Sequence, residues 1–80
     1  MNKKFVYLIL DKLNGFYKIG ISVNANERIK TLQTGNAGEL ILIDEVEVEG
    51  ANKLEKELHS KYNECRVRGE WFRFDKNQLN

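Results

Sequence analysis

Residues 16–21, Phe-Tyr-Lys-Ile-Gly-Ile, follow the wholly apolar run Phe-Val-Tyr-Leu-Ile-Leu at residues 5–10, and these two stretches decide the fold. Residues 4–11 predict a strand, and its unbroken apolar character indicates burial on both faces, as in the central strand of a sheet. The Asn-Gly pair at residues 14–15 tolerates positive φ, so residues 16–21 should be the second strand of a β-hairpin. Gly20 interrupts that strand where a Cβ would obstruct a bulge or a close approach of the backbone.

A helix and a third strand are expected next. Ser22 and Asn24 are both plausible N-caps for a helix over about residues 25–33, because apolar side chains recur there at helical spacing. Arg28 lies beside that apolar stripe. A glycine-rich exit leads to a strand at residues 39–48, whose second half alternates acidic and apolar side chains, as at a sheet edge with one wet face.

A second helix is predicted over residues 51–64, because apolar side chains again recur at helical spacing. A loop at 65–69, a short aromatic strand at 70–74 and a tail at 75–80 complete the chain. The sequence therefore predicts a single α/β (α+β) domain over residues 1–80, with an antiparallel sheet of about three strands and flanking helices. The expected order is β-β-α-β-α plus the short terminal strand.

Composition limits the classes of function. A chain of 80 residues with 41% hydrophobic and 31% charged side chains fits one core. It has no apolar run near the roughly 20 residues that cross a bilayer and no apolar segment of a signal peptide, so we expect a cytoplasmic protein without a membrane partner. The single cysteine, Cys65, is interpreted as a bystander, because it cannot form a disulfide within the chain or a zinc cluster with one histidine.

Charge is distributed unevenly along the chain. The formal net charge of +1 gives no global basic signature, so a role in nucleic-acid binding cannot rest on it. The charged side chains of residues 39–49 are all acidic, whereas Lys and Arg crowd the C-terminal third. If the domain binds phosphate, the acidic segment should face away from it.

Glu55 is the most informative single position. On the second predicted helix it lies at the border of the core-facing arc, where a carboxylate is costly to bury unless it meets a cation, a metal or several donors. Two interpretations stay open: a structural ion pair with Arg28 or Lys18, or a metal ligand. His59, one helical turn along, is either a second site residue or part of the amphipathic margin of the helix.

Tyr7, in an otherwise aliphatic strand, is by default a core aromatic with its hydroxyl at the rim. It becomes a useful general base only if positive charge lowers its pKa from about 10, and Lys18 and Arg28 could provide that charge.

Residues near the C-terminus also have two interpretations each. Trp71 and Phe72 either cap the core or provide a platform on which bases stack. Arg66 and Arg68 belong either to a solvated loop or to a phosphate-binding surface.

Taken together, the order and spacing of these motifs resemble the GIY-YIG nuclease superfamily, most closely its compact phage-type branch with a Tyr-Lys-Ile-Gly second motif and a terminal Gly-Glu-Trp-Phe. The resemblance covers nearly the whole chain. Its matching positions are residues 6–8 at the first motif, residues 18–20 at the second, Arg28 eight residues after Gly20, the helix with Glu55 and His59, and residues 69–72 at the closing motif.

The chain departs from the family pattern at three places. Phe5 replaces the glycine of the first motif, and the late asparagine of the family has no secure counterpart. Lys18 occupies the place of the second tyrosine, while Tyr17 is displaced onto the opposite face of its strand. Lys18 is therefore predicted to face the phosphate, and Tyr17 to be a packing residue.

The resemblance implies a divalent-metal-dependent DNA endonuclease that hydrolyses phosphodiester bonds. Tyr7 would be the general base toward a water, and Glu55 would hold one Mg²⁺ or Mn²⁺, since hard cations take oxygen ligands. The expected catalytic residues are Tyr7, Lys18, Arg28, Glu55 and His59, with Lys18, Arg28, Arg66 and Arg68 binding DNA and with Gly20, Trp71 and Phe72 as structural parts of the motifs.

Two other functions are also consistent with the sequence. One is a catalytically weak or inactive DNA-binding module that uses the same basic face. The other is an interaction domain that acts through the acidic segment 39–49. In each case a domain this small offers a limited footprint, so sequence specificity would need a homodimer or a fused specificity domain.

Overall fold

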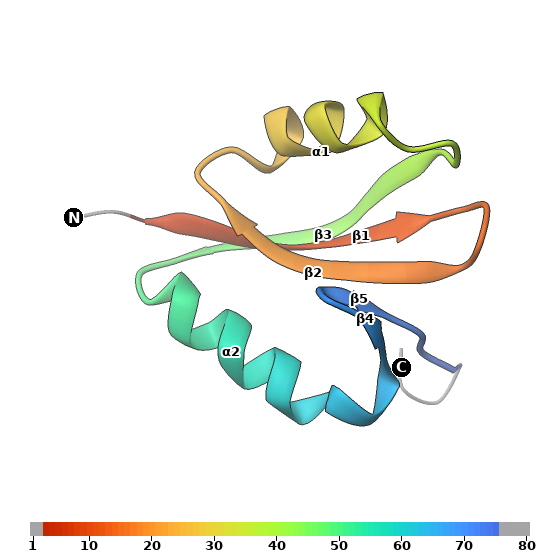
Figure 1. Cartoon of the computed structure of the whole chain (residues 1–80). Helices are drawn as coiled ribbons and strands as arrows, with labels where there is room; N and C mark the ends of the chain where they lie inside the picture. Colours follow the sequence, from red (N-terminus) through yellow and green to blue (C-terminus); the bar gives the residue numbers. More distant parts are fainter. Residues whose placement is uncertain (1–2, 76–80) are drawn as a thin grey trace.

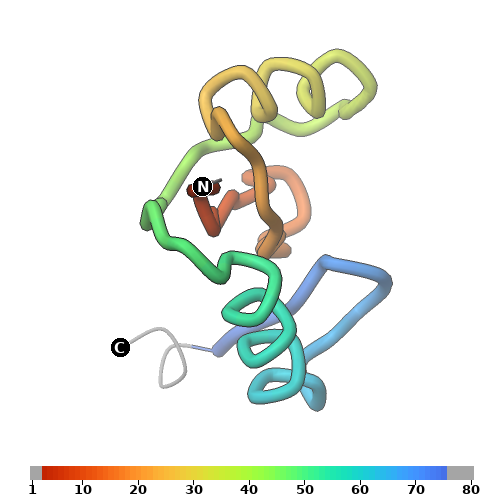
Figure 2. Tube along the Cα trace, turned by 90° about the vertical axis from the view of Figure 1, so that its left-hand side faces the viewer, coloured from red at the N-terminus to blue at the C-terminus, as the bar shows by residue number. Residues whose placement is uncertain are grey.

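The computed structural model describes residues 3–75, which form a small α+β domain with a five-stranded antiparallel sheet between two helices (Figures 1 and 2). The strand order in the sheet is β3-β1-β2-β5-β4. The elements are β1 (Lys4–Asp11), β2 (Phe16–Ser22), α1 (Ala25–Thr34), β3 (Leu40–Val48), α2 (Ala51–Lys61), the 3₁₀ turn η1 (Asn63–Cys65), β4 (Arg66–Arg68) and β5 (Trp71–Phe72).

Strand β1 is buried on both faces, as its apolar run predicts. Val6 packs on one face in a core that includes Leu54 and Leu58 of α2. Ile9 packs on the other face in a core that includes Ala25 of α1. Side chains of a strand alternate between its faces, so one continuous apolar strand supports both helices.

The predicted hairpin joins β1 to β2. Gly15 has φ 76, and the side chain of Asn14 accepts a hydrogen bond from the backbone N–H of Phe16. In the resulting register Tyr7 faces Gly20 across the two strands. Gly20 provides room for the aromatic ring of Tyr7, because a Cβ at this position would lie 2.5 Å from the Tyr7 hydroxyl oxygen.

Helix α1 begins after Asn24, whose side chain accepts a hydrogen bond from the backbone N–H of Glu27. Of the two predicted N-caps, Asn24 is therefore the one used, while the Ser22 hydroxyl bonds to the backbone of Asn24. Strand β3 lies at one edge of the sheet, as its alternating pattern indicates.

The prediction of three strands is wrong, because β4 and β5 extend the sheet beyond β2. Gly69, with φ 57, makes the turn between these two short strands. The predicted loop at residues 65–69 contains β4, whose side chains are all exposed and therefore show no alternation of buried and exposed positions. The predicted aromatic strand at 70–74 is shorter than expected, and α2 ends at Lys61, before residue 64.

Within residues 3–75, neither helix has the length and the apolar character that a membrane span requires. Of the predicted tail at residues 75–80, only Asp75 belongs to the described residues, and residues 76–80 lie outside them.

We expect Gly20→Ala to destabilise the domain by about 1 to 3 kcal/mol, because the new methyl group overlaps the Tyr7 side chain. Urea unfolding followed by circular dichroism measures the loss. Gly35→Ala is the matched control, since a Cβ there meets no atom within 4 Å and the residue has φ −102. Equal stability of the two variants would contradict the close contact between Gly20 and Tyr7.

Candidate functional site

The candidate site lies at the edge of β2, where the pairing of β5 with β2 stops. The paired residues are Tyr17 with Phe72 and Lys18 with Trp71. At the next position, the N–H of Ile19 donates to the backbone oxygen of Glu70 at 3.1 Å, but the Ile19 oxygen accepts from His59 Nε2 at 2.9 Å. Helix α2 and the turn between β4 and β5 therefore meet at this edge.

Tyr7 reaches the same edge from the neighbouring strand. Its ring passes over Gly20, and the residue is only 2% exposed. Burial raises the pKa of Tyr7 to about 12; the negative charge of Glu70 adds to this rise, Arg28 opposes it, and Glu55 adds to it. The condition that positive charge lowers this pKa is therefore not met in the protein alone, because burial and two carboxylates outweigh Arg28.

Three side chains from two segments form a potential cation site beside Tyr7. Glu55 and His59 come from α2, and Glu70 comes from the turn that precedes β5. One ligand atom from each of the three lies within 4.8 Å of the others, and each residue is partly buried. We call these three residues the Glu-His-Glu cluster.

Glu55 has the unsatisfied oxygen of this cluster. Its Oε2 atom is buried and has no hydrogen-bond donor among residues 3–75. Desolvation raises the pKa of the Glu55 carboxyl, and so do the negative charge of Glu70 and a hydrogen bond with the Glu70 side chain. The charges of His59 and Lys18 lower this pKa. A carboxylate buried in this way is stabilised by a cation.

The expected alternative for Glu55, an ion pair with Arg28 or Lys18, is not formed within the described part of the chain. Lys18 pairs with Glu70 instead, at 3.0 Å between Nζ and Oε1. Arg28 is exposed on α1 and makes no ion pair with residues 3–75. Sequence periodicity thus placed Glu55 correctly at the core border, while its neighbours could not be deduced from the same pattern.

The hydrogen bond of His59 decides which of its ring nitrogens can bind a cation. A carbonyl oxygen only accepts, so Nε2 carries the proton in the bond to Ile19. A neutral ring then has its lone pair on Nδ1. Histidine ligands of metals commonly donate their other ring N–H to a backbone carbonyl in this way, so the donor set fits a divalent cation.

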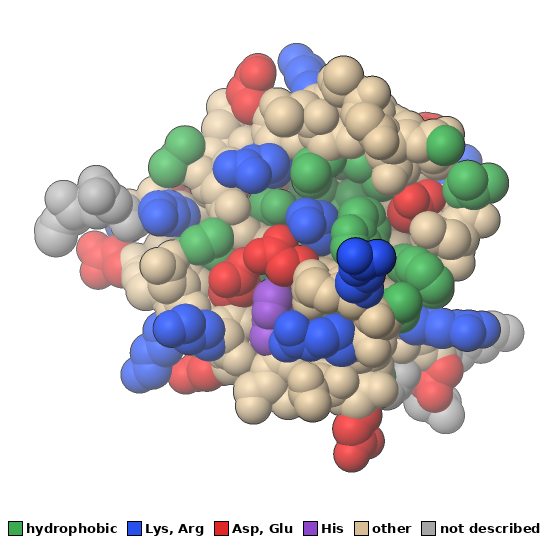
Figure 3. Space-filling model, in the orientation of Figure 1, with side chains coloured by type: hydrophobic (Ala, Val, Ile, Leu, Met, Phe, Trp, Pro, Cys, Tyr) green, Lys and Arg blue, Asp and Glu red, His purple; other side chains and the backbone are tan. Residues whose placement is uncertain are grey.

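Basic side chains surround the cluster on the face of the molecule seen in Figure 3, where acidic side chains lie next to the single histidine. Arg66 and Arg68 are both exposed on β4. Arg66 also donates to the backbone oxygen of Gly69 at 3.0 Å and lies over the ring of Phe72. Both arginines are therefore accessible next to the candidate site.

The aromatic residues of the motifs have mainly structural positions. Phe72 is fully buried in the core beneath α2. Trp71 packs partly against the core on the α1 side, and the Lys18 ammonium lies 5.3 Å from its ring centre. Tyr17 contacts Phe74 on the face opposite to Tyr7, in agreement with its predicted packing role.

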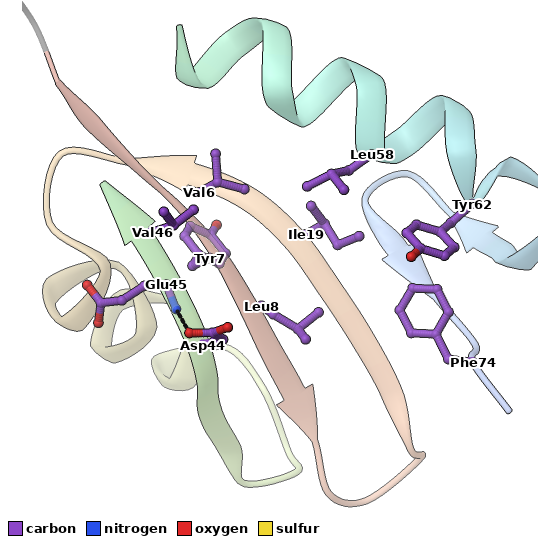
Figure 4. A pocket seen from close by; sticks show the side chains of 10 residues that line it. All are labelled: Val6, Tyr7, Leu8, Ile19, Asp44, Glu45, Val46, Leu58, Tyr62 and Phe74. Carbon is purple, nitrogen blue, oxygen red and sulfur yellow. Dashed lines mark hydrogen bonds between the residues drawn. The ribbon is translucent and has the colours of Figure 1, made fainter. Parts of the chain in front are cut away.

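A cavity of about 270 Å³ lies between the sheet and the end of α2, and Tyr7 is among the residues that line it (Figure 4). Its walls are largely apolar, and Asp44 and Glu45 at its rim are acidic. None of the residues of the Glu-His-Glu cluster lines it. Because the three potential cation ligands lie outside this cavity, the candidate site is the cluster at the edge of β2.

Glu70 is the site residue that the sequence analysis missed. It was noted only as part of the closing Gly-Glu-Trp-Phe motif. One signal was available, because Glu70 is the only acidic residue between Arg66 and Arg73, a stretch that is otherwise basic or apolar.

The fold and the cluster define a small α+β domain with a candidate cation site where the pairing of β5 with β2 stops. The family model described as the T5orf172 domain matches residues 4–80, and the chain belongs to that family. The predicted assignment to the GIY-YIG superfamily is corrected by this match, which is to a different family. No curated protein and no solved structure matches the chain.

The pKa of Tyr7 predicts a pH dependence of stability. The usual value is 10.0 and the value in the folded protein is about 12, so the unfolded chain loses this proton first as the pH rises. The protonated Tyr7 therefore contributes on the order of 2 kcal/mol to the free energy of unfolding below pH 10, and this contribution is lost as the pH rises toward 12.

Urea unfolding of wild type and Tyr7→Phe at intervals between pH 8 and pH 12 tests this expectation. The difference in the free energy of unfolding between the two proteins at pH 8 is the reference, because Tyr7 is protonated there in both the folded and the unfolded wild type. Wild type should lose stability relative to Tyr7→Phe above pH 10. Parallel pH profiles of the two proteins would contradict a raised pKa.

Proposed function

We propose that this domain is a divalent-cation-dependent DNA endonuclease that hydrolyses phosphodiester bonds where the pairing of β5 with β2 stops. The observation that carries the proposal is the buried Glu55 oxygen without a donor, within a cluster that includes an imidazole and a second carboxylate. The proposed catalytic residues are Tyr7, Lys18, Arg28, Glu55 and His59.

Glu55 is the proposed ligand of Mg²⁺ or Mn²⁺, and His59 lies beside it. A divalent cation supplies positive charge where negative charge develops on the phosphate during displacement. Oxygen ligands suit both ions, and a nitrogen ligand is better tolerated by Mn²⁺. The hydrogen bond from His59 Nε2 to the Ile19 oxygen restrains the ring and leaves Nδ1 as the nitrogen with which it would bind the cation.

Tyr7 is the proposed general base toward a water. With a pKa of about 12 it stays protonated at neutral pH in the protein alone. Two further causes of that rise are the negative charges of Glu70 and Glu55. A bound cation would compensate these two charges, while Arg28 continues to favour the phenolate. Burial, the largest cause of the rise, remains, so the proposed role requires that the cation and Arg28 together favour the phenolate, which can then accept a proton from water.

Arg28 is the proposed phosphate ligand on the α1 side. It is exposed, it forms no ion pair within residues 3–75, and it is close enough to Tyr7 to influence its pKa. A guanidinium can donate two parallel hydrogen bonds to phosphate oxygens. Its position would hold the scissile phosphate next to the Tyr7 hydroxyl.

The arrangement of charge in the sheet favours DNA as the substrate. Acidic β3 lies at one edge of the sheet, and β4, with Arg66 and Arg68, lies at the opposite edge. A polyanion is thus attracted toward the candidate site and repelled from β3. Sequence specificity would come from a second copy of the domain or from a fused specificity domain, because the footprint of this domain is small.

We expect the purified protein to nick supercoiled plasmid with Mg²⁺ or Mn²⁺, and Glu55→Gln to reduce the rate by at least about 100-fold, because the variant removes the proposed ligand. Glu57→Gln is the matched control: it makes the same change at an exposed position of the same helix. A wild type that fails to nick with either ion, or a Glu55→Gln variant as fast as wild type, would refute the proposal.

A DNA-binding module that does not cleave is the second candidate. The raised pKa of Tyr7 and the engagement of Lys18 by Glu70 favour it, since neither residue is ready for catalysis in the protein alone. Binding of DNA without nicking by the wild type would support this candidate over the nuclease.

Filter binding between 50 and 200 mM salt in the presence of EDTA measures the phosphate contacts that both candidates require. Arg28→Gln should lower the slope of log K against log salt by about 0.9, the value for one lost phosphate contact. Lys12→Gln should leave the slope unchanged, because Lys12 pairs with Glu39. Equal slopes for wild type and Arg28→Gln would exclude Arg28 from the DNA-binding surface.

A further inference from the structure

Glu70 belongs to two arrangements of charge at once. Its Oε1 atom lies 3.0 Å from the ammonium of Lys18, and one of its carboxylate oxygens lies within 4.8 Å of ligand atoms of Glu55 and His59. One carboxylate therefore faces both an internal cation and a candidate site for an external one.

The ammonium of Lys18 is well placed to act as an internal cation. Its side chain is 15% exposed, and its Nζ atom lies over the ring of Trp71. An ion pair that is partly shielded from water is stronger than one on the open surface. Lys18 also acts electrostatically on Glu55, so it offsets the negative charge of both carboxylates in the protein alone.

A divalent ion in the Glu-His-Glu cluster and the Lys18 ammonium compete for the negative charge of Glu70. Their positive charges repel, and an oxygen coordinated to a hard cation is a weaker acceptor for the ammonium. The flexible four-carbon stem of lysine allows the ammonium to move away.

We propose that Glu70 is a cation ligand that Lys18 neutralises in the protein alone, and that binding of a divalent cation to the Glu-His-Glu cluster releases Lys18 to contact a DNA phosphate. This inference rests on the cation site of the proposed function. It assigns Glu70 a role in binding the cation and makes Lys18 its competitor.

The exchange couples the two ligands of the site. Cation binding adds a free positive charge to the surface where DNA is proposed to bind, so it should raise DNA affinity. By thermodynamic reciprocity, DNA should raise the affinity for the cation by the same factor. The coupling needs no movement of the backbone, because the lysine side chain alone changes its partner.

Calorimetric titration with Mg²⁺ and with Mn²⁺ tests the exchange through cation binding, independently of cleavage. Lys18→Met should bind each ion about 3- to 10-fold more tightly than wild type, because the competitor for Glu70 is removed. Glu70→Gln should bind each ion at least about 10-fold more weakly. Lys12→Met, which removes the same charge from a pair with Glu39, should keep the wild-type affinity.

The single tryptophan of the chain, Trp71, provides a second measurement. The Lys18 ammonium lies 5.3 Å from its ring centre, so departure of this charge should change the Trp71 emission when Mg²⁺ is added to wild type. The change should be smaller in Lys18→Met and unaltered in Lys12→Met. If Lys18→Met does not fold, as judged by circular dichroism, Lys18→Gln replaces it with the same expectations.

Measurements of DNA binding test whether the released Lys18 ammonium contacts phosphate. In a Tyr7→Phe background, which lacks the proposed base, Mg²⁺ should increase the affinity for a DNA duplex, and adding Lys18→Met should reduce that increase. An increase that Lys18→Met leaves unchanged would show that the ammonium does not reach phosphate and would overturn the inference.

The outcomes separate the inference from the proposed function. If wild type and Lys18→Met bind the cation with equal affinity, or if Glu70→Gln binds it as tightly as wild type does, the exchange is overturned. A Glu55-dependent nuclease would remain possible in either case. A wild type that binds neither ion overturns both.

Discussion

The pairing of β5 with β2 stops after Lys18 and Trp71, and the candidate site depends on that stop. Directly opposed residues of an antiparallel ladder commonly exchange two hydrogen bonds, but Ile19 donates to Glu70 and accepts from His59. The side chain of His59, from α2, thus takes the place of a strand as the hydrogen-bond partner of the Ile19 oxygen. One interruption of the ladder brings together a helix from one face, a turn at the edge, and Tyr7 over Gly20.

Electrostatic balance explains why this edge is suited to a cation. Glu55 and Glu70 lie close together and are partly buried, and the pKa of the Glu55 carboxyl is raised by desolvation and by the charge of Glu70. A buried oxygen without a donor typically costs about 1 to 3 kcal/mol, more for a charged group, so packing alone does not account for Glu55. Local arrangements that lower stability without an evident structural gain occur chiefly at functional sites.

The sequence predicted the elements whose side chains repeat regularly. The apolar run of β1, the hairpin at Gly15 and the stripes of both helices all follow from local periodicity, and so does the position of Glu55 at the core border. Strand β4 could not be predicted, because its exposed side chains carry no pattern. The pair of Lys18 and Glu70 joins residues far apart in the chain, and no local signal links them. The raised pKa of Tyr7 likewise depends on burial and on distant carboxylates.

Function in this domain has to be argued from the site, since a small sheet with two helices accommodates many activities. The net charge of +1 conceals a separation of charge across the sheet, because acidic β3 and basic β4 lie at opposite edges. Solvent-exposed charges act over about 8 to 10 Å at physiological ionic strength, so a polyanion responds to the nearer edge and not to the net charge. The Glu-His-Glu cluster includes Glu70 from the turn between β4 and β5, and the charges of Glu55, Glu70 and Arg28 all act on Tyr7. The negative cluster would repel phosphate if it stood alone, so the proposed nuclease function requires that a cation occupy the cluster when the phosphodiester binds.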